Sequence, residues 1–373
     1  MSIKQTITHN LLDIPGWRTK RHILVIESDD WGSIRMPSRE VYEEFLRRGV
    51  KVDKDPYCRY DNLATKEDLE ALFEVLVSVK DQHGHHAVLT ADTVVANPVF
   101  EKIRESGFND YYYEPFTETL KRSAAHEGVW ELWQQGMSAR VFRPQFHGRE
   151  HLNVKKWLRT LRSGEPITKM AFDLGTFGLT SAVDASIKNN YMGAFNSGLD
   201  DDIKEYDKII TEGLALFEQL FGYKSESFIA TTYTWSPKIE ASLKRNGVKF
   251  LQGMVHQHIP IDDDTTFEWK KNNFIGRKSP EGLMYLMRNC YFEPSQGGET
   301  AEKCMNRVKT AFRWNKPATL SMHRLNVIGS IDESNRTRNL ADLKWLLNQI
   351  VKEYPDVEFM SSDELGRIIE NTR

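Results

Sequence analysis

The stretch His-Ile-Leu-Val-Ile-Glu-Ser-Asp-Asp-Trp-Gly, residues 22–32, decides the predicted fold. Its first half, residues 22–26, is a short apolar run rich in β-branched residues, which is typical of a buried strand. The run then gives way to a polar cluster that contains two adjacent carboxylates, Asp29 and Asp30, and that Gly32 closes. Parallel α/β folds place their active sites where strands end. The segment is therefore predicted to be the first strand of a parallel sheet and the first part of a site.

The remainder of the chain repeats a rhythm of helix and strand. An amphipathic helix is predicted over residues 65–80 and a strand over 87–90, an order that argues for parallel βαβ units. Later predicted strands cover residues 140–146, 227–230, 248–251, 284–292, 318–322 and 357–360. No Pro/Gly/Ser-rich linker divides the chain. We therefore expect an α/β fold of the (β/α)-barrel type, one domain over residues 1–373, with insertions at about 97–140 and 165–203.

Composition excludes several classes of function. Basic and acidic residues nearly balance, at 50 against 53, and no Lys/Arg block stands out, so a nucleic-acid partner is not expected. No apolar stretch approaches the roughly 18 residues that span a bilayer. The opening residues, 1–17, lack the basic and apolar regions of a secretory signal. The cysteines, Cys58, Cys290 and Cys304, are far apart and are expected to be reduced. We expect a cytoplasmic protein; its oligomeric state is open.

The second chemical motif is His-Gly-Arg-Glu-His, residues 147–151, which directly follows the predicted strand 140–146. If the segment is helical, the four-residue spacing puts both imidazoles on one face, close enough to share a metal ion. The motif lacks the glutamate that follows the first histidine in the zincin metalloproteases. The alternative is a pair of surface histidines at the start of a helix. The predicted strand would place both histidines at a strand end, where parallel α/β folds have their active sites, and this favours the metal-binding interpretation.

A third feature, His323, ends the apolar strand predicted over residues 318–322. Each feature alone has a structural alternative: a helix-capping acid, surface histidines, or a polar strand end. Together, two neutral imidazoles and one carboxylate make a three-ligand site that leaves positions open for water and substrate. A second carboxylate and a further histidine then remain for proton transfer.

In this order the motifs resemble those of the polysaccharide deacetylases of carbohydrate esterase family four, from about residue 20 to 368. That family shares the NodB-homology domain, a distorted (β/α)-barrel of about seven strands. The resemblance implies that Asp29 is the catalytic base and His323 the general acid. It also implies a metal bound by three ligands, Asp30, His147 and His151.

The implied activity is a metal-dependent removal of acetyl groups, N- or O-linked, from a carbohydrate, with water attacking at the metal. Zn²⁺ is the default cofactor, with Co²⁺, Ni²⁺ or Fe²⁺ as alternatives. Two other functions remain open on the same barrel. One is hydrolysis of a C–N bond in a cyclic amide or ureide, and the other is a non-catalytic, carbohydrate-binding role.

The chain departs from the family in one motif. The family places an arginine there that braces the catalytic aspartate, whereas the matching segment, residues 228–235, contains none. Arg143 and Arg288 are the candidates to supply this charge from another strand. Candidate substrate-binding residues are Trp31, Arg143, Tyr233, Trp235 and Arg288, and Asp92 is a weaker candidate to line the cleft. His256-Gln257-His258 is predicted to be a solvated loop.

Overall fold

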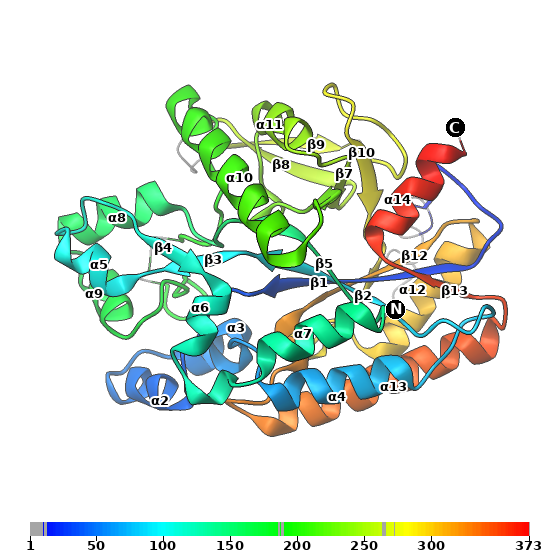
Figure 1. Cartoon of the computed structure of the whole chain (residues 1–373), viewed down its shortest axis with the longest axis horizontal. Coiled ribbons are helices and arrows are strands. Elements are labelled where there is room, and N and C mark those ends of the chain that lie inside the picture. The colour runs from blue at the N-terminus through cyan, green and yellow to red at the C-terminus, as the bar shows by residue number, and fades with distance from the viewer. Residues whose placement is uncertain are drawn as a thin grey trace.

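The computed structural model describes residues 10, 13–185, 187, 190–262, 266–271 and 273–372. Its central feature is a parallel sheet with the strand order β10-β7-β6-β5-β2-β1-β12-β11, to which β13 adds beside β1 (Figure 1). The strands are β1 (Ile23–Trp31), β2 (Leu89–Val94), β5 (Phe142–Gly148), β6 (Ser227–Phe228), β7 (Phe250–Gly253), β10 (Met284–Met287), β11 (Cys290–Tyr291), β12 (Ala318–His323) and β13 (Glu358–Met360).

The two ends of this sheet meet in one interrupted strand. β10 pairs with β7, β11 pairs with β12, and only Arg288 and Asn289 separate β10 from β11. The Arg288 amide donates to the Gly253 carbonyl at 2.8 Å, and the Asn289 amide donates to the Thr319 carbonyl at 3.3 Å. The sheet therefore curls into a barrel of seven strand positions, counting β10 with β11 as one. The predicted distorted barrel is confirmed.

Strand β1 is buried along its whole length, since all nine of its residues are buried. A continuous buried run is what a parallel strand with both faces covered requires. β1 pairs with β2 on one side and with β12 on the other. The register with β12 places Asp29 opposite His323, so two residues about 290 positions apart in sequence meet at one point of the barrel rim.

Helices cover the outside of the barrel (Figure 1). Below the strands in this view lie α4 (Lys66–Val77), α7 (Val129–Ser138), α12 (Ala301–Arg313) and α13 (Glu333–Glu353). Above them lie α10 (Asp200–Phe221) and α11 (Glu240–Arg245), and α14 (Ser362–Asn371) lies near the C-terminus. Helix α4 starts with a capping box in which Thr65 and Asp68 satisfy each other's backbone amides.

Shorter elements gather beyond the carboxyl ends of the strands, at the left of Figure 1. They are α2 (Arg39–Arg47), α3 (Pro56–Tyr60), the hairpin of β3 (Ala96–Pro98) with β4 (Tyr113–Pro115), α5 (Phe100–Glu105), α6 (Phe116–Lys121), α8 (Val154–Ser163) and α9 (Pro166–Asp173). Most belong to the two predicted insertions or to the segment after β1. They surround the end of the barrel where the chemical motifs lie.

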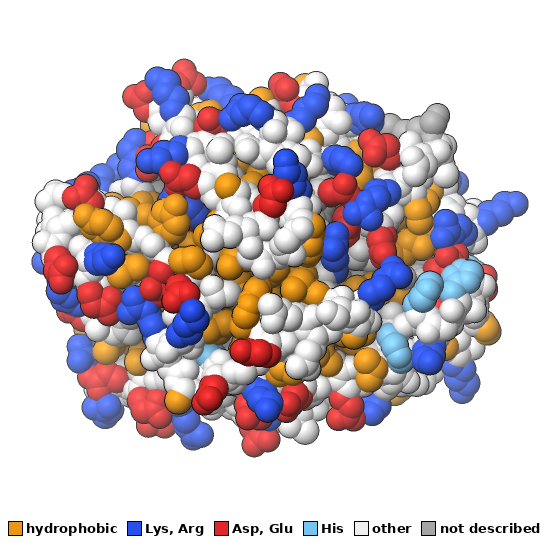
Figure 2. Space-filling model, viewed as in Figure 1, with side chains coloured by type: hydrophobic (Ala, Val, Ile, Leu, Met, Phe, Trp, Pro, Cys, Tyr) orange, Lys and Arg blue, Asp and Glu red, His pale blue; other side chains and the backbone are white. Residues whose placement is uncertain are grey.

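The surface carries both signs of charge. On the face shown in Figure 2, acidic and basic side chains are interspersed, as the near-balanced composition predicts. Within the described residues, no helix combines the length and apolar character needed to cross a bilayer. All three cysteines are free and buried. Most of the opening segment, on which the prediction of no secretory signal depends, lies outside the described residues.

The prediction for His256-Gln257-His258 is wrong. These residues belong to β8 (His256–Pro260), which pairs antiparallel with β9 (Phe267–Lys271). The Gln257 side chain is buried and donates to the Trp235 carbonyl at 2.9 Å. His256 and His258 both contact the ring of Trp269, at centroid distances of 6.1 and 3.9 Å. The cross-strand aromatic contact stabilises a hairpin that the polar sequence does not suggest.

Candidate functional site

Asp29 and Asp30 lie inside β1, near its carboxyl end. Adjacent residues of a regular strand point to opposite faces, yet both carboxylates line the same pocket. The cause is an irregularity: the register with β2 shifts between Ser28 and Trp31, and Asp30 has a positive φ of 75°. Such a conformation is strained for a residue other than glycine, and it is typical of functional positions.

The two histidines come from a strand end and a loop. His147 lies in β5, and His151 lies between β5 and α8, so the helical premise for their spacing is wrong. Gly148, with φ of 140°, directs the chain away from the strand. A buried ion pair between Arg149 and Glu150, at 2.6 Å, fixes the turn that follows. The turn still brings the two rings together, with centroids 5.2 Å apart.

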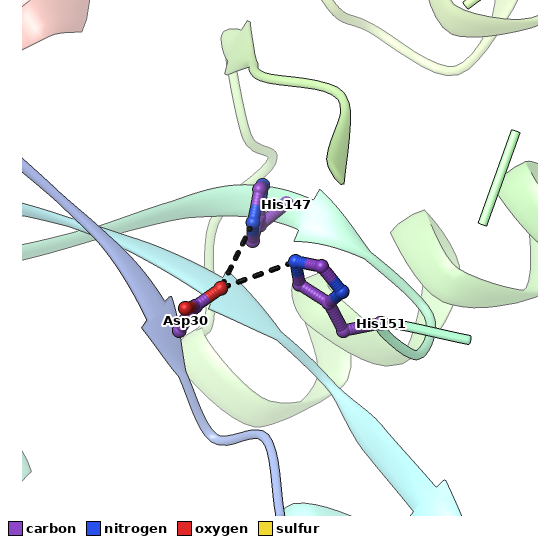
Figure 3. Close-up of side chains that lie close together, drawn as sticks. All are labelled: Asp30, His147 and His151. Atoms are coloured by element: carbon purple, nitrogen blue, oxygen red, sulfur yellow. Dashed lines mark ion pairs between the residues drawn. The ribbon is translucent and has the colours of Figure 1, made fainter. Parts of the chain in front are cut away.

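Asp30, His147 and His151 form a compact donor cluster (Figure 3). Both imidazoles face the same carboxylate oxygen: Asp30 Oδ1 lies 3.5 Å from His147 Nε2 and 3.2 Å from His151 Nε2. His147 Nδ1 lies 2.9 Å from the Ile229 carbonyl, which only accepts, so Nδ1 carries the proton. The lone pair of His147 Nε2 is buried and has no hydrogen-bond partner. A divalent cation fits this group of two nitrogens and one oxygen.

The surroundings of the cluster favour an ionised Asp30 and a neutral His151, which are the forms that bind a cation. Burial alone would raise the pKa of Asp30, but Arg35 and His151 hold it well below the usual range. Arg35 Nη2 donates to the other oxygen, Asp30 Oδ2, at 2.9 Å, which leaves Oδ1 to the histidines. Burial also lowers the pKa of His151 to about 4, so this ring is neutral near pH 7.

Asp29 is braced by Arg288. The guanidinium donates to both of its oxygens, from Nη1 to Oδ2 at 2.7 Å and from Nη2 to Oδ1 at 2.6 Å. Burial opposes ionisation, but Arg288 lowers the pKa of Asp29 to about 2. Arg288 also contacts Glu27 at 2.6 Å and Asp92 at 2.9 Å. Because burial raises the pKa of Asp92 well above its usual range, Asp92 keeps its proton while Asp29 stays ionised.

His323 faces Asp29 from the end of β12. Its Nε2 lies 3.8 Å from Asp29 Oδ2, and its Nδ1 lies 2.5 Å from Glu293 Oε1. The second oxygen of Glu293 accepts from Asn326 Nδ2 at 2.7 Å, which holds the carboxylate in place. Burial would lower the pKa of His323, but Glu293 and the nearby aspartates raise it to about 9. The site therefore presents an imidazolium beside an ionised carboxylate.

These groups lie in a pocket of about 360 Å³. Its lining comprises Asp29, Asp30, Arg35, Asp55, Tyr57, His147, His151, Gly178, Thr180, Ala182, Asn190, Met192, Ala230, Thr232, Tyr233 and His323. All five residues to which the motifs assign a role are therefore at one place. Tyr233 joins them because Thr232 and Tyr233 both have positive φ, 58° and 57°, which turns the chain sharply after β6. The Tyr233 hydroxyl accepts from Arg288 Nη1 at 2.9 Å.

Four of the five proposed substrate-binding residues lie outside the pocket lining. Arg288 is fully buried beneath Asp29, which it contacts in place of a substrate. Trp31 is fully buried in the core, where it packs edge-on against Phe142 and Trp133. It lies outside the pocket because it follows the irregular backbone at Asp30. Trp235 is also buried, and its Nε1 donates to Glu240 at 3.3 Å.

Arg143 lies at the start of β5, whereas His147 lies near its end. It pairs there with Asp363 at 2.9 Å and stacks on the Tyr223 ring at 3.8 Å. It therefore cannot brace Asp29, and Arg288 is the arginine that does so. The sequence left these two alternatives open because strand pairing alone decides which arginine enters the barrel.

Sequence reasoning missed three contributors to the site: Arg35, Tyr57 and Glu293. Arg35 and Tyr57 belong to the segment that follows β1, and Glu293 follows β11. Glu293 had a detectable signal, since it is an acid directly after a predicted strand, the same position that singled out Asp29. Arg35 and Tyr57 had none, because the turns that bring them to the pocket are not apparent from periodicity.

Neither the family models nor the curated proteins compared with the sequence give a match. The structure aligns with a protein from Pseudomonas aeruginosa PAO1 assigned as a polysaccharide deacetylase, at 12% identity over 93% of this chain and 91% of that one (TM-score 0.44). It aligns with Puue allantoinase at 13% identity over 94% and 91% (TM-score 0.42). With 4-α-glucanotransferase from Thermococcus litoralis, the match covers 92% of this chain but only 40% of the other, at 8% identity (TM-score 0.45).

The deacetylases that the motifs resemble are thus represented among the aligned structures. The three identities and TM-scores are low.

Proposed function

We propose that the protein is a metal-dependent hydrolase that removes an N- or O-linked acetyl group from a carbohydrate. One observation carries this proposal: an ionised carboxylate, Asp29, and an imidazolium, His323, face each other beside a three-donor cluster in one pocket. A base and an acid on either side of a Lewis-acid site are the groups that acyl hydrolysis requires.

The cluster of Asp30, His147 and His151 would hold the cation. A divalent ion bound there supplies a Lewis acid for the acyl oxygen; Zn²⁺ suits two imidazoles and one carboxylate, with Co²⁺, Ni²⁺ or Fe²⁺ as alternatives. Arg35 positions the carboxylate ligand through the oxygen that faces away from the histidines. The Ile229 carbonyl orients the His147 ring in the same way.

Asp29 accepts the proton of the water that attacks the acyl carbon. Its low pKa keeps it ionised at every physiological pH, and the bidentate contact with Arg288 fixes its orientation. His323 then donates the proton on Nε2 to the leaving amine or alkoxide as the C–N or C–O bond breaks. Glu293, on the opposite ring nitrogen, keeps that proton in place until the leaving group takes it. The products are acetate and the free amine or hydroxyl.

The test combines metal analysis with acetate release. The purified protein, stripped of metal and then supplied with Zn²⁺ or Co²⁺, is assayed on acetylated sugars and on a cyclic ureide. We expect one equivalent of bound metal, metal-dependent acetate release, and loss of both in the double variant H147A/H151A. A matched control is H83A/H85A, because these two histidines are exposed and do not line the pocket.

Other outcomes assign the site differently. Ring opening of the ureide without acetate release would favour the C–N hydrolase alternative. Sugar binding without turnover in the metal-loaded protein would favour a non-catalytic role. If the protein binds no divalent ion, or if H147A/H151A binds it as well as the wild type, the proposal is wrong.

A further inference from the structure

A second groove lies outside the barrel, where α6, α7 and α10 meet a short 3₁₀ turn, Ala124–His126 (Figure 1). Its volume is about 740 Å³, against about 360 Å³ for the pocket that holds Asp29, and the two share no lining residue. Figure 2 shows hydrophobic side chains gathered across the middle of this face, between α10 above and α7 below. A groove of this volume is within the range, ~300–1,000 Å³, that accommodates small ligands.

The groove has an aromatic side at Trp130. The indole is half-buried, and its ring packs against Phe116 and Phe221, each at a centroid distance of 5.8 Å. Leu120 and Leu220 extend the apolar part of the lining. Because these contacts fix the ring, a ligand that packs on it orders little further protein. An aromatic ring held in this way offers a flat apolar surface, such as the C–H face of a sugar ring covers.

The lining also contains a buried hydrogen-bond acceptor, His126, which is 8% exposed. Its Nε2 lies 3.3 Å from the Leu63 carbonyl, which only accepts, so Nε2 carries the proton. Burial lowers the pKa of His126, so the ring is neutral near pH 7 and Nδ1 keeps its lone pair. Within the described residues, Nδ1 has no hydrogen-bond partner. A buried acceptor without a partner has lost its bond to water, and a ligand that donates to it restores that bond.

The remaining polar groups of the lining favour a ligand rich in hydrogen-bond donors. Glu127 and Glu131 are exposed, and neither forms an ion pair with the part of the chain that the structure describes. Lys121 is already paired with Glu118 at 2.7 Å. The uncharged polar side chains of the lining are Thr117, Ser123, Gln134 and Gln219. An anionic ligand would meet two unpaired carboxylates, whereas a cationic one is attracted by them.

We propose that this groove binds a carbohydrate unit that packs on Trp130 and donates a hydroxyl hydrogen bond to His126 Nδ1, and that it prefers an amino sugar to a neutral one. A sugar ring combines a C–H face with hydroxyl groups around its edge, and an amino group adds the positive charge that Glu127 and Glu131 attract. A basic peptide would also suit the carboxylates, but its backbone carbonyls would add acceptors to a lining that already contains several. The inference does not require that the protein hydrolyse anything.

The test measures binding of two trisaccharides, of glucosamine and of glucose, to the metal-loaded full chain by calorimetry. Neither carries an acetyl group, so the proposed hydrolysis does not interfere. Near pH 7, where the amino groups are still mostly protonated, we expect the glucosamine trimer to bind about fivefold more tightly. This preference should shrink as the salt concentration rises. Trilysine, the peptide probe, should bind more weakly than either sugar.

Variants then locate the binding. E127Q/E131Q should weaken the glucosamine trimer about fivefold and leave the glucose trimer almost unchanged. Its matched control is E70Q/E74Q, which removes two exposed carboxylates of α4 that do not line the groove. W130L should weaken both sugars by about tenfold or more, in contrast to W345L, which removes an exposed tryptophan of α13. If W130L unfolds, the exposed pair E127Q/E131Q still decides the location.

A spectroscopic signal reports on His126 directly. With ¹⁵N-labelled histidine, the resonance of His126 Nδ1 should move when either trisaccharide saturates the protein, because the lone pair then accepts a hydrogen bond. The inference is overturned if neither sugar binds, or if both bind but the groove variants and the His126 resonance do not respond. Tight binding of trilysine that E127Q/E131Q abolishes would assign the groove to basic peptides instead. None of these outcomes alters the test of acetate release.

Discussion

Arg288 holds both carboxylate oxygens of Asp29, at 2.7 and 2.6 Å, from the two-residue gap in which the barrel closes between β10 and β11. The same guanidinium contacts Glu27 and Asp92, and it is fully buried. One guanidinium thus contacts three buried carboxyl groups, of which one performs the proposed chemistry.

R288Q should therefore unfold more easily than the wild type. Removing one partner from a buried ionic network leaves charge unpaired and typically costs about 3–5 kcal/mol. R288K keeps the charge but loses the bidentate geometry, so we expect a smaller loss of stability together with a large loss of activity. Chemical denaturation and steady-state kinetics on both variants check this. If R288K is as active as the wild type, the geometry of the contact is irrelevant to Asp29.

D29N should lower kcat by about 10²–10⁴ if Asp29 is the base, because the amide cannot accept the proton of water. The metal content should not change, since Asp29 is not one of the three donors. D92N is the matched control: Asp92 lies on the same arginine but keeps its proton, so an amide replaces it with little change. Equal losses in D29N and D92N would assign the effect to the network rather than to a base.

E293Q should lower the pKa of His323. This pKa, about 9 in the folded protein, is raised above its ordinary value chiefly by Glu293. The stability gained from that shift is fully present below about pH 6.5, the ordinary value for histidine, and is lost as pH rises through 9. In E293Q the imidazolium should lose its proton at a lower pH, and the alkaline limb of activity should move with it.

NMR titration of the metal-free wild type and E293Q measures the His323 pKa directly. N326A removes the side chain that donates to Glu293 and also to the His323 carbonyl, and it should give a smaller shift in the same direction. A His323 pKa that is the same in the wild type and in E293Q would contradict the assignment of Glu293.

Metal binding should stabilise the folded protein. A ligand that binds only the folded state at a concentration of 100 times its Kd contributes about 2.7 kcal/mol. We expect Zn²⁺ to raise the melting temperature of the wild type but not that of H151A. H126A serves as the control, since His126 is a buried histidine that bonds to the Leu63 carbonyl and lies outside the cluster. Equal stabilisation of H151A and the wild type would place the metal elsewhere.

Much of the barrel was predictable because its strands are apolar runs between amphipathic helices. The predicted strand over residues 22–26 corresponds to β1 and that over 318–322 to β12, each extended by one to five residues. The extension of β1 matters most. Asp29 and Asp30 are inside the strand, and only an irregular backbone lets both face the pocket. A positive φ at an aspartate is set by tertiary packing, so no local pattern predicts it.

The site was predictable in its residue types but not in its supports. The spacing predicted that the His147 and His151 rings lie together, as they do in the structure, but the premise of a shared helix is wrong. Arg288 was one of two candidates to brace Asp29, and Arg35 and Glu293 were missed. All three come from different connections, and their positions depend on how distant segments pair. Spatial proximity of this kind is a property of the closed barrel and is not encoded in any one window of sequence.

The position of Arg288 at the seam of the barrel has a consequence for assembly. Arg288 lies between β10, which pairs with β7, and β11, which pairs with β12, so its contact with Asp29 forms only when these strands join the two ends of the sheet. The orientation of the proposed base is therefore set by the closure of the ring and not by β1 alone.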